Sequence, residues 1–329
     1  MKKNVVTTIG GAVRDITFYT DEAVLIDNPK DLLRQKLIGI EYGAKIYSEK
    51  IYLTYGGGGM NTAVNFAGLG IKAETILSLG DDFISQDIIK YLKEKSIGTS
   101  LVQKQKNIYT GTSFILNMHS YNDRVIFVSR GANNKIKLSP EVVKKINSDW
   151  VFITAVSGSW QKKLKNVFTH CKKKKIKIAW NPGSGELKVG LKKLTSYMKS
   201  AEVFIVNRDE ALELLMSIKN KKIKDDIDLL LKTLHASGQK ITVITDGKIG
   251  AYLYDGKKKY FRPALKRKAV NTTGAGDAFG SSLVAGIIKY KGDLDKALKL
   301  AILNSNSVIM KIGAQEGLLK ARDLKKYKL

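Results

Sequence analysis

Short apolar runs of strand length alternate with helical patterns over most of the chain, and this alternation limits the folds open to it. Such runs are typical of strands that are buried on both faces of a parallel sheet and joined by helical crossovers. The runs are Val5 to Ile9, Thr75 to Leu79, Trp150 to Thr154, Ile176 to Trp180, Val203 to Val206, Ile241 to Thr245 and Ala251 to Tyr254. The helical patterns are Met60 to Leu69, Phe83 to Lys95, Pro140 to Ile146, Arg208 to Met216, Ile227 to Ala236 and the two stretches after Gly276 and Leu294. The sequence therefore predicts an α/β fold with a doubly wound, mainly parallel sheet in a three-layer, Rossmann-like arrangement.

Glycine and polar residues follow several of these predicted strands. Doubly wound sheets bind their ligands at the carboxyl ends of the strands, so residues at these positions should share one edge of the sheet. The residues concerned are Gly10 with Gly11, Asn181 to Gly183, Asn207, and Asp246 with Gly247. We expect the ligand site at this edge.

Three segments break the alternation, namely 17–26, 38–55 and 110–129. Their two-residue periodicity and their many aromatic side chains predict a separate small antiparallel sheet. Exposed aromatic residues on such a sheet would suit a homodimer contact. The segment 27–36 reads as an insertion between two of these strands, and a helix is one interpretation of it.

The segment from Asn271 to Phe279 carries the strongest chemical signal. Gly274, Ala275 and Gly276 lead into an apolar helix, and the first N–H groups of a helix lack intrahelical partners and lie at the positive end of its dipole. We expect these amides to bind a phosphate. Asp277 would repel a phosphate but suits a base for a hydroxyl that attacks it. The structural alternative is a helix cap after an ordinary glycine turn.

A second glycine cluster, Gly56 to Gly59, precedes the helical pattern that begins at Met60. Four consecutive glycines are costly in backbone entropy. We interpret them as a place where the backbone approaches a ligand, since a flexible linker would lack a packed helix behind it.

With both clusters in view, the chain resembles the ribokinase/PfkB family of sugar and nucleoside kinases. The segment from Gly56 to Asn61 is similar to the N-terminal signature of that family, and the segment from Thr272 to Phe279 is similar to its C-terminal signature. Residues 206–211 resemble its Asn-x-x-Glu element, and residues 244–251 resemble its nucleotide-side strand and turn. Matching segments in family order extend from about Ile9 to Gly313.

This resemblance implies a single ribokinase-like kinase domain over residues 1–329. A lid formed by about 15–55 and 108–130 would close over the sugar and exclude water, which would otherwise hydrolyse the activated phosphoryl group. The resemblance also implies that the protein uses ATP and Mg²⁺.

For the acceptor, the resemblance implies that Asp15 and Asn61 hold substrate hydroxyls, with Gly57 and Gly58 beside the substrate. A carboxylate is a natural acceptor for two vicinal hydroxyls. The chain departs from ribokinases at Val13, where they tend to carry an amide, and at Gly58, where they tend to carry a lysine. These departures argue against ribose.

For the nucleotide, the implied contacts are Asn207, Thr245, Gly247, Gly250 and Asn304. Lys248 and Asn306 are further candidates nearby. Asn207 and Glu210 would act on Mg²⁺, which binds oxygen ligands and keeps several waters; from the residues alone, a helix-capping box is the alternative. Asn271 stands where many family members have Asp close to a monovalent-cation site, so we expect a K⁺ site to be weakened.

The net charge of +27 raises the question of nucleic-acid binding. Lysine carries most of the charge, it is scattered along the chain, and its densest run, Lys172 to Lys175, has no interleaved aromatic residue for base stacking. We therefore expect no nucleic-acid partner.

The single Cys171 excludes an intrachain disulfide, and the histidines, His119, His170 and His235, lack metal-ligand spacing. No apolar run is long enough to span a membrane, so we expect a cytoplasmic protein without a membrane partner.

The residues and the resemblance together predict an ATP-dependent carbohydrate kinase that phosphorylates a primary hydroxyl of a small sugar, with Asp277 as general base and the Gly274 to Gly276 amides stabilising the developing charge. A nucleoside kinase and a sugar-phosphate kinase of the phosphofructokinase-like type are the alternatives within the family. Outside it, the alternatives are a catalytically inactive sugar-binding protein and a basic nucleic-acid binder.

Overall fold

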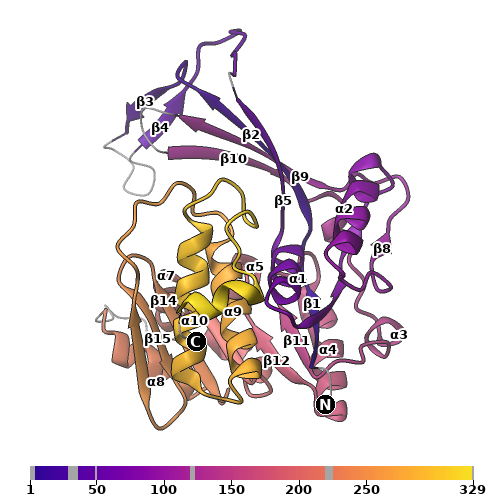
Figure 1. The fold of residues 1–329 in the computed structure, drawn as a ribbon, viewed down its shortest axis with the longest axis vertical. Helices are drawn as coiled ribbons and strands as arrows, with labels where there is room; N and C mark the ends of the chain where they lie inside the picture. Colours follow the sequence, from indigo (N-terminus) through magenta and orange to yellow (C-terminus); the bar gives the residue numbers. More distant parts are fainter. Residues whose placement is uncertain (1–3, 29–35, 49, 119–122, 219–224, 328–329) are drawn as a thin grey trace.

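An eight-stranded sheet forms the centre of the fold, with the strand order β16-β15-β14-β13-β12-β11-β1-β6 (Figure 1). The computed structural model describes residues 4–28, 36–48, 50–118, 123–218 and 225–327. The strands from β6 to β14 are parallel, and β15 and β16 pair antiparallel at one edge. The bounds are β1 (Val5–Ile9), β6 (Lys72–Ile76), β11 (Trp150–Ile153), β12 (Lys177–Trp180), β13 (Val203–Asn207), β14 (Ile241–Asp246), β15 (Gly250–Tyr254) and β16 (Lys259–Pro263). The predicted doubly wound, mainly parallel sheet is confirmed.

Helices cover both faces of this sheet and give the three layers. Alternate residues of the central strands point to opposite faces: Trp150 and Phe152 join one core, whereas Val151 and Ile153 join the other. One face packs against α1 (Gly58–Gly68), α2 (Phe83–Glu94), α9 (Ala275–Lys289) and α10 (Leu294–Val308). The other packs against α3 (Pro140–Val143), α4 (Trp160–Lys174), α5 (Ser184–Leu187), α6 (Leu191–Met198), α7 (Arg208–Met216) and α8 (Ile227–His235).

A second, smaller sheet extends from one end of the central layer (Figure 1). Its order is β10-β9-β2-β5, and a hairpin of β3 and β4 lies beside it. Two of its ladders are antiparallel, whereas β2 and β9 pair in parallel. The bounds are β2 (Val13–Thr20), β3 (Val24–Asp27), β4 (Lys36–Gly39), β5 (Ile51–Gly56), β9 (Gly111–Met118) and β10 (Asp123–Ser129).

The two faces of the small sheet differ in character. Residues that lie opposite one another across the ladders share a face. One face, which we call the apolar sheet face, carries exposed side chains such as Leu53 (57% exposed) and Phe127 (61% exposed). Its members are Ile16, Phe18, Ile51, Leu53, Phe114, Leu116, Val125 and Phe127. The opposite face carries the buried residues Asp15, Thr17 and Ile115.

Several elements differ from the sequence-based expectation. The strand predicted over 75–79 starts earlier and is divided into β6 and β7 (Ser78–Leu79), which pairs with β8 (Gln103–Lys104). Helix α4 was not predicted, because its lysine-rich exposed side obscures the buried stripe that includes Leu164 and Phe168. The edge strand β16 was not predicted either, because its alternating burial has little apolar signal. The short helices η1 (Gly131–Lys135) and η2 (Ala321–Tyr327) complete the described chain.

The insertion expected over 27–36 falls mostly outside the described residues, which leave out 29–35. Its two ends are strand residues: Asp27 ends β3, Lys36 begins β4, and their side chains form an ion pair of 2.5 Å. Within the described ranges, no helix is long and apolar enough to cross a membrane.

The end of β1 and the start of α1 approach each other so closely that side chains would collide there. A Cβ on Gly10 would lie 2.0 Å from Thr154 Oγ1 and 2.7 Å from the Gly59 nitrogen, and a Cβ on Gly59 would lie 2.8 Å from the Gly10 backbone. The backbone of Met60 donates a hydrogen bond of 3.2 Å to the carbonyl of Gly11. Glycine at both positions therefore lets the helix start directly on the end of the strand.

The other three positions of the glycine cluster are confined in the same way. A Cβ on Gly56 would lie 2.2 Å from Asp15 Oδ2, and one on Gly58 would lie 2.6 Å from Thr154 Oγ1. Gly57 has a φ of +92°, and its Cβ would lie 2.5 Å from the Gly11 carbonyl oxygen. Contacts within the chain therefore already require glycine at every position of the cluster, and the approach of a ligand to this segment stays a prediction.

We predict that Gly59→Ala lowers the free energy of unfolding by about 1–3 kcal/mol, because the added methyl group overpacks a backbone contact that cannot relax. Gly185→Ala is the matched control, since a Cβ there would meet no atom within 4 Å. Urea denaturation followed by circular dichroism measures both changes. Equal stability of the two variants would contradict this account of the glycine contact.

Candidate active site

The first turn of α9 is open on one side. Gly274 is its N-cap, with a φ of +78°, and a Cβ there would lie 2.5 Å from the Cβ of Ala314. Gly276 is exposed, and a Cβ there would meet no atom within 4 Å. The Ala275 amide lies 3.3 Å from the Thr272 carbonyl oxygen, so this one of the three expected amides already has a weak partner. The helix start thus presents backbone N–H groups beside an unobstructed glycine, as an anion site requires.

Asp277 lies in this turn and is bonded to the glycine-rich segment. The Asn61 amide donates a hydrogen bond of 2.8 Å from Nδ2 to Asp277 Oδ2. Burial raises the pKa of the Asp277 carboxyl above its ordinary range, and the hydrogen bond from Asn61 opposes part of that rise. The two signature segments, 216 residues apart in the chain, therefore meet side chain to side chain.

Asn61 is itself held by a residue that the sequence analysis missed. Gln315, in the loop after α10, donates a hydrogen bond of 2.8 Å from Nε2 to Asn61 Oδ1. Tyr91 of α2 donates a hydrogen bond of 3.0 Å to Gln315 Oε1. No spacing rule marks an isolated glutamine in a loop, so nothing in the sequence indicated this contact.

Asp15 lies on the buried face of the small sheet, next to the glycine-rich segment. It is 5% exposed and accepts a short hydrogen bond from the hydroxyl of Ser113 on β9. Burial raises the pKa of its carboxyl, and the bond from Ser113 acts in the opposite direction. Its Oδ2 lies against Gly56. Asp15 therefore lies beside the first residue of the segment 56–61, and Asn61 is its last residue.

The structure also gives a physical reason for the departure at Gly58. The side chain of Thr154, at the end of β11, fills the space that a residue larger than glycine would need at position 58. A lysine there would require Thr154 to move or to be smaller. Val13, the other departure, is half-buried in the first position of β2.

Asn207 and Glu210 form a capping box at the start of α7. Asn207 Oδ1 accepts from the Glu210 amide at 2.8 Å, and Glu210 Oε2 accepts from the Asn207 amide at 2.8 Å. Burial raises the pKa of the Glu210 carboxyl. The helix-capping box, which was the structural alternative, is therefore present. It leaves acceptor positions of the Glu210 carboxylate free, because an ionised carboxylate offers about four of them.

Asn207 also lies beside the expected nucleotide residues of β14. Asn207 pairs with Thr245 across the ladder of β13 and β14, so both lie at the carboxyl edge of the sheet. Arg208, the first residue of α7, links this helix to the end of β14. Its guanidinium makes ion pairs with Asp246 and with Asp225, the latter at 3.0 Å. Beyond them Gly247 has a φ of +46° and is exposed, with open space where a Cβ would lie; Lys248 is exposed too.

Two of the expected nucleotide contacts need correction. Gly250 is buried in the β15–β16 ladder, where a Cβ would lie 2.1 Å from the Arg262 carbonyl oxygen. Asn304 is fully buried; it donates to Asn65 and Ser282 at 2.7 Å each and accepts from the Leu319 amide at 2.8 Å. Both residues serve packing between elements, and neither presents a side chain or open backbone to the nucleotide edge.

The remaining asparagines lie close to the loops of the site. Asn306 donates to the Leu265 carbonyl at 3.2 Å. Asn271 is buried and forms a turn in which its Oδ1 accepts from the Thr273 amide at 2.7 Å. The buried hydroxyl oxygen of Thr273 has no hydrogen-bond partner among the described residues.

Two further buried polar residues that the sequence analysis passed over hold the loops at the strand ends. Asn133 of η1 makes two hydrogen bonds with the backbone of Ala12, at 2.9 and 3.0 Å. Glu186 accepts from the amides of Val156 at 2.6 Å and Gly183 at 3.1 Å, and burial raises the pKa of its carboxyl. These residues position the loops that follow β1, β11 and β12.

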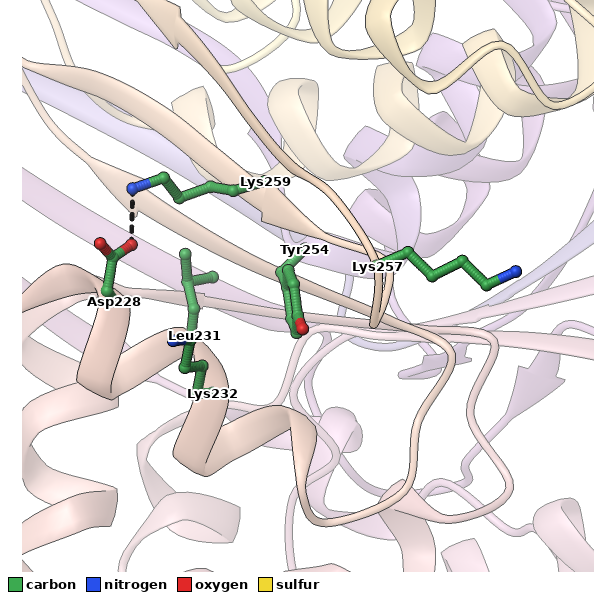
Figure 2. A pocket seen from close by; sticks show the side chains of 6 residues that line it. All are labelled: Asp228, Leu231, Lys232, Tyr254, Lys257 and Lys259. Atoms are coloured by element: carbon green, nitrogen blue, oxygen red, sulfur yellow. Dashed lines mark hydrogen bonds and ion pairs between the residues drawn. The ribbon is translucent and has the colours of Figure 1, made fainter.

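A cavity of about 360 Å³ lies elsewhere, between α8 and the β15–β16 hairpin (Figure 2). Lys259 reaches across it to Asp228 in an ion pair of 2.6 Å. None of the expected site residues lines this cavity, whose walls are Asp228, Leu231, Lys232, Tyr254, Lys257 and Lys259. In the described part of the chain, no three His, Cys, Asp or Glu side chains group into a metal cluster.

Comparison with known proteins finds relatives of this chain both in sequence and in fold. The chain is 26% identical over 288 residues to a ribokinase of Lactococcus lactis, covering 86% of this chain and 88% of the relative. It is 25% identical over 313 residues to an ATP-dependent 6-phosphofructokinase of Thermoanaerobacterium thermosaccharolyticum, covering 90% and 93%. The fold matches the structure of a Methanocaldococcus jannaschii nucleoside kinase with a TM-score of 0.76 and 21% identity, covering 98% and 97%.

The decisive match is to a family as a whole. Residues 31–321 match the model of the pfkB family carbohydrate kinases, which is most of the chain and includes both glycine-rich segments. The expected resemblance is thereby confirmed, and with it the assignment of a carbohydrate kinase. The chain belongs to the pfkB family of carbohydrate kinases.

Proposed function

We propose that this protein transfers the γ-phosphoryl group of ATP to a primary hydroxyl of a small sugar, with Asp277 as general base. The hydrogen bond between Asn61 and Asp277 carries the proposal. It joins the segment expected to hold the acceptor to the helix start expected to hold the phosphates. A hydroxyl bound beside Asn61 would therefore lie next to the base.

The reaction needs few groups from the protein. The Asp277 carboxylate takes the proton of the attacking hydroxyl as its oxygen bonds to the γ-phosphorus, the bond from that phosphorus to the bridging oxygen breaks, and ADP leaves. Backbone N–H groups at the start of α9 face the charge that develops on the phosphoryl oxygens. The open space at Gly276 supports this placement.

The nature of the acceptor rests on Asp15 and Asn61. A buried carboxylate and an amide flank the segment 56–61 and offer acceptors and donors for vicinal hydroxyls. At position 58, where ribokinases tend to carry a lysine, this chain has glycine, and the side chain of Thr154 fills the space beside it. This difference argues against ribose as the acceptor. A nucleoside kinase and a sugar-phosphate kinase stay as alternatives, since the relatives include a ribokinase and a 6-phosphofructokinase and the fold is shared with a nucleoside kinase.

A coupled ADP-release screen separates these alternatives. The acceptors are ribose, fructose, ketodeoxy sugars, fructose-6-phosphate, adenosine, cytidine and inosine, each with MgATP. We expect turnover with a free sugar. Turnover with nucleosides only would replace the first choice by the second, and turnover with none would favour an inactive sugar-binding protein.

Mg²⁺ would be held at the nucleotide edge by Glu210, with Asn207 beside it. The capping box leaves acceptor positions on the Glu210 carboxylate, so the residues fit an ion that keeps most of its waters. When bound, Mg²⁺ neutralises charge on the phosphates.

For a monovalent cation, the unpartnered Thr273 hydroxyl supports a site, and the neutral Asn271 should make it weak. A large activation by K⁺ in a salt titration at constant ionic strength would contradict this.

We further propose that the chain acts as one kinase domain with the small sheet as its lid, and that it forms a homodimer through the apolar sheet face. The exposed side chains of that face support the dimer, since contiguous exposed apolar surface is typical of protein contacts. A cytoplasmic location and the absence of a nucleic-acid partner remain predictions from composition.

Replacement of Asp277 by Asn should lower turnover by about 10²–10⁴-fold, the usual contribution of a general base. The amide oxygen can still accept from Asn61, so folding should survive. Steady-state kinetics measure the loss, with thermal melting and ATP binding to confirm an intact fold. Asp228→Asn, in the first turn of α8, is the matched control and should leave turnover unchanged. An Asp277→Asn variant within about threefold of the parent would identify Asp277 as a structural cap.

Glu210→Gln should raise the Mg²⁺ concentration needed for half-maximal rate while leaving sugar affinity nearly unchanged. The glutamine oxygen can still accept from the Asn207 amide, so the helix cap is kept and only the charge is lost. Titration of the rate with Mg²⁺ at fixed ATP measures the effect, and Glu213→Gln on the same helix is the control. An unaltered Mg²⁺ dependence would mean that Glu210 serves only as a cap.

Leu53→Lys should convert the proposed dimer to a monomer, because it places a charge on the apolar sheet face, at the edge strand β5. Sedimentation velocity of parent and variant measures the association state. Phe83→Lys replaces an apolar side chain that is 83% exposed at the start of α2 and is not a member of the apolar sheet face, so it should leave the dimer intact. A parent protein that sediments as a monomer would overturn the proposal.

A further inference from the structure

Three hydrogen bonds link the proposed base to a tyrosine on another helix. Tyr91 donates to Gln315 at 3.0 Å, Gln315 donates to Asn61 at 2.8 Å, and Asn61 donates to Asp277 at 2.8 Å. Gln315 and Asn61 are both buried, at 7% and 4% exposure. We call this the Tyr91–Asp277 relay.

Tyr91, at the outer end of the relay, sets which way each hydrogen bond in it runs. Burial raises the pKa of Tyr91 to about 12, so its hydroxyl keeps its proton over the working range and donates to Gln315 Oε1. With its oxygen engaged there, Gln315 turns Nε2 to Asn61. An amide that receives a hydrogen bond on its oxygen presents its nitrogen at the other end, and Asn61 Nδ2 thus faces Asp277.

Neighbouring groups hold both ends of the relay in place. The ring of Tyr91 packs against Tyr55 of β5 with 4.7 Å between centroids. Next to Gln315, Ala314 packs against the N-cap glycine of α9, and Gly313 lies against Thr54 of β5. The loop of Gln315 therefore touches α9, α1 and the root of the small sheet.

We propose that Gln315 is a positioning residue that fixes the orientation of the Asn61 amide, so that its N–H group and not its carbonyl oxygen faces Asp277. The proposal rests on the proposed function, because it assigns Gln315 a role through the base of that reaction. With Asn61 reversed, its carbonyl oxygen would confront the carboxylate. That arrangement favours the protonated acid, which cannot accept the hydroxyl proton.

Several charged and titratable groups face Tyr91 and Tyr55 at the outer end of the relay. They are Glu94 at the end of α2, Lys95 directly after it, Glu316 beside Gln315, and Arg14, whose guanidinium lies 4.7 Å from the Tyr55 ring centroid. At the inner end, burial and the Asn61 hydrogen bond are the influences on the pKa of Asp277. Loss of that hydrogen bond should therefore raise the pKa, and the acid limb of the pH–rate profile should move to higher pH.

A titration that needs no acceptor tests the orientation directly. In protein labelled with ¹⁵N at asparagine, the Asn61 side-chain amide signals, assigned by their loss in Asn61→Ala, should shift with pH as Asp277 titrates, and Asp277→Asn should abolish that shift. Gln315→Leu should move the midpoint of this titration upward. Gln239→Leu is the matched control, since Gln239 is also buried, its amide nitrogen bonds to Leu234 and Thr242, and it lies between α8 and β14, outside the relay; it should leave the midpoint unchanged. An unchanged midpoint in Gln315→Leu overturns the proposal.

Kinetics with the acceptor that turns over supply the second measurement. Gln315→Leu should lower kcat/KM by about tenfold, the order expected for a lost hydrogen bond to a charged group, and move the acid limb upward. In an Asn61→Ala background the same substitution should have no further effect, because it acts through Asn61. Additive losses would overturn the proposal while leaving the kinase function intact, whereas an active Asp277→Asn variant would overturn the proposed base and not the relay.

Discussion

The close contact between the backbones of Gly10 and Gly59 sets where α1, and with it Asn61, lies relative to β1. It lets α1 begin on the end of β1, with a backbone hydrogen bond from Met60 to Gly11. One residue later Asn61 faces α9. Any side chain at either glycine would separate the helix from the strand and move Asn61 away from Asp277. A backbone packing constraint therefore sets the position of Asn61, which holds the proposed base.

The interface of α1 and α9 repeats this arrangement one turn further along. Asn61 donates to Asp277, and four residues later in both helices Asn65 donates to Ser281 at 2.7 Å. Asn304 of α10 bonds to Asn65, so a third helix is fixed to the pair. Buried polar groups that are fully paired specify one arrangement of their elements. The core network around Asn65 thus keeps the helix spacing on which the contact between Asn61 and Asp277 depends.

The long patterned elements could be predicted from the sequence, since α7 runs from Arg208 to Met216 as the apolar spacing indicated. The family signatures marked Asn61 and Asp277 as site residues, whereas the hydrogen bond between them appears only in the folded chain. Other features depend on tertiary contacts that leave no local signal. Asn304 looks like a polar residue on a helix surface and is a core amide, and Gln315 contacts a residue 254 positions away. The glycines were recognised as unusual, but their cause is packing against β1, Asp15 and Thr154, which only the folded chain brings together.

In the proposed reaction Asp277 acts as a base; burial raises the pKa of its carboxyl, and the hydrogen bond from Asn61 opposes part of that rise. A single-turnover rapid-quench measurement of phosphoryl transfer across pH tests it most directly, because it isolates the chemical step from product release. The ionised carboxylate is the active form, so the rate should rise with pH through one ionisation, with an apparent pKa above the ordinary aspartate range, and then reach a plateau. The Asp277→Asn variant should lack this limb. A transfer rate that does not change with pH, or a limb that persists in the variant, would contradict the account.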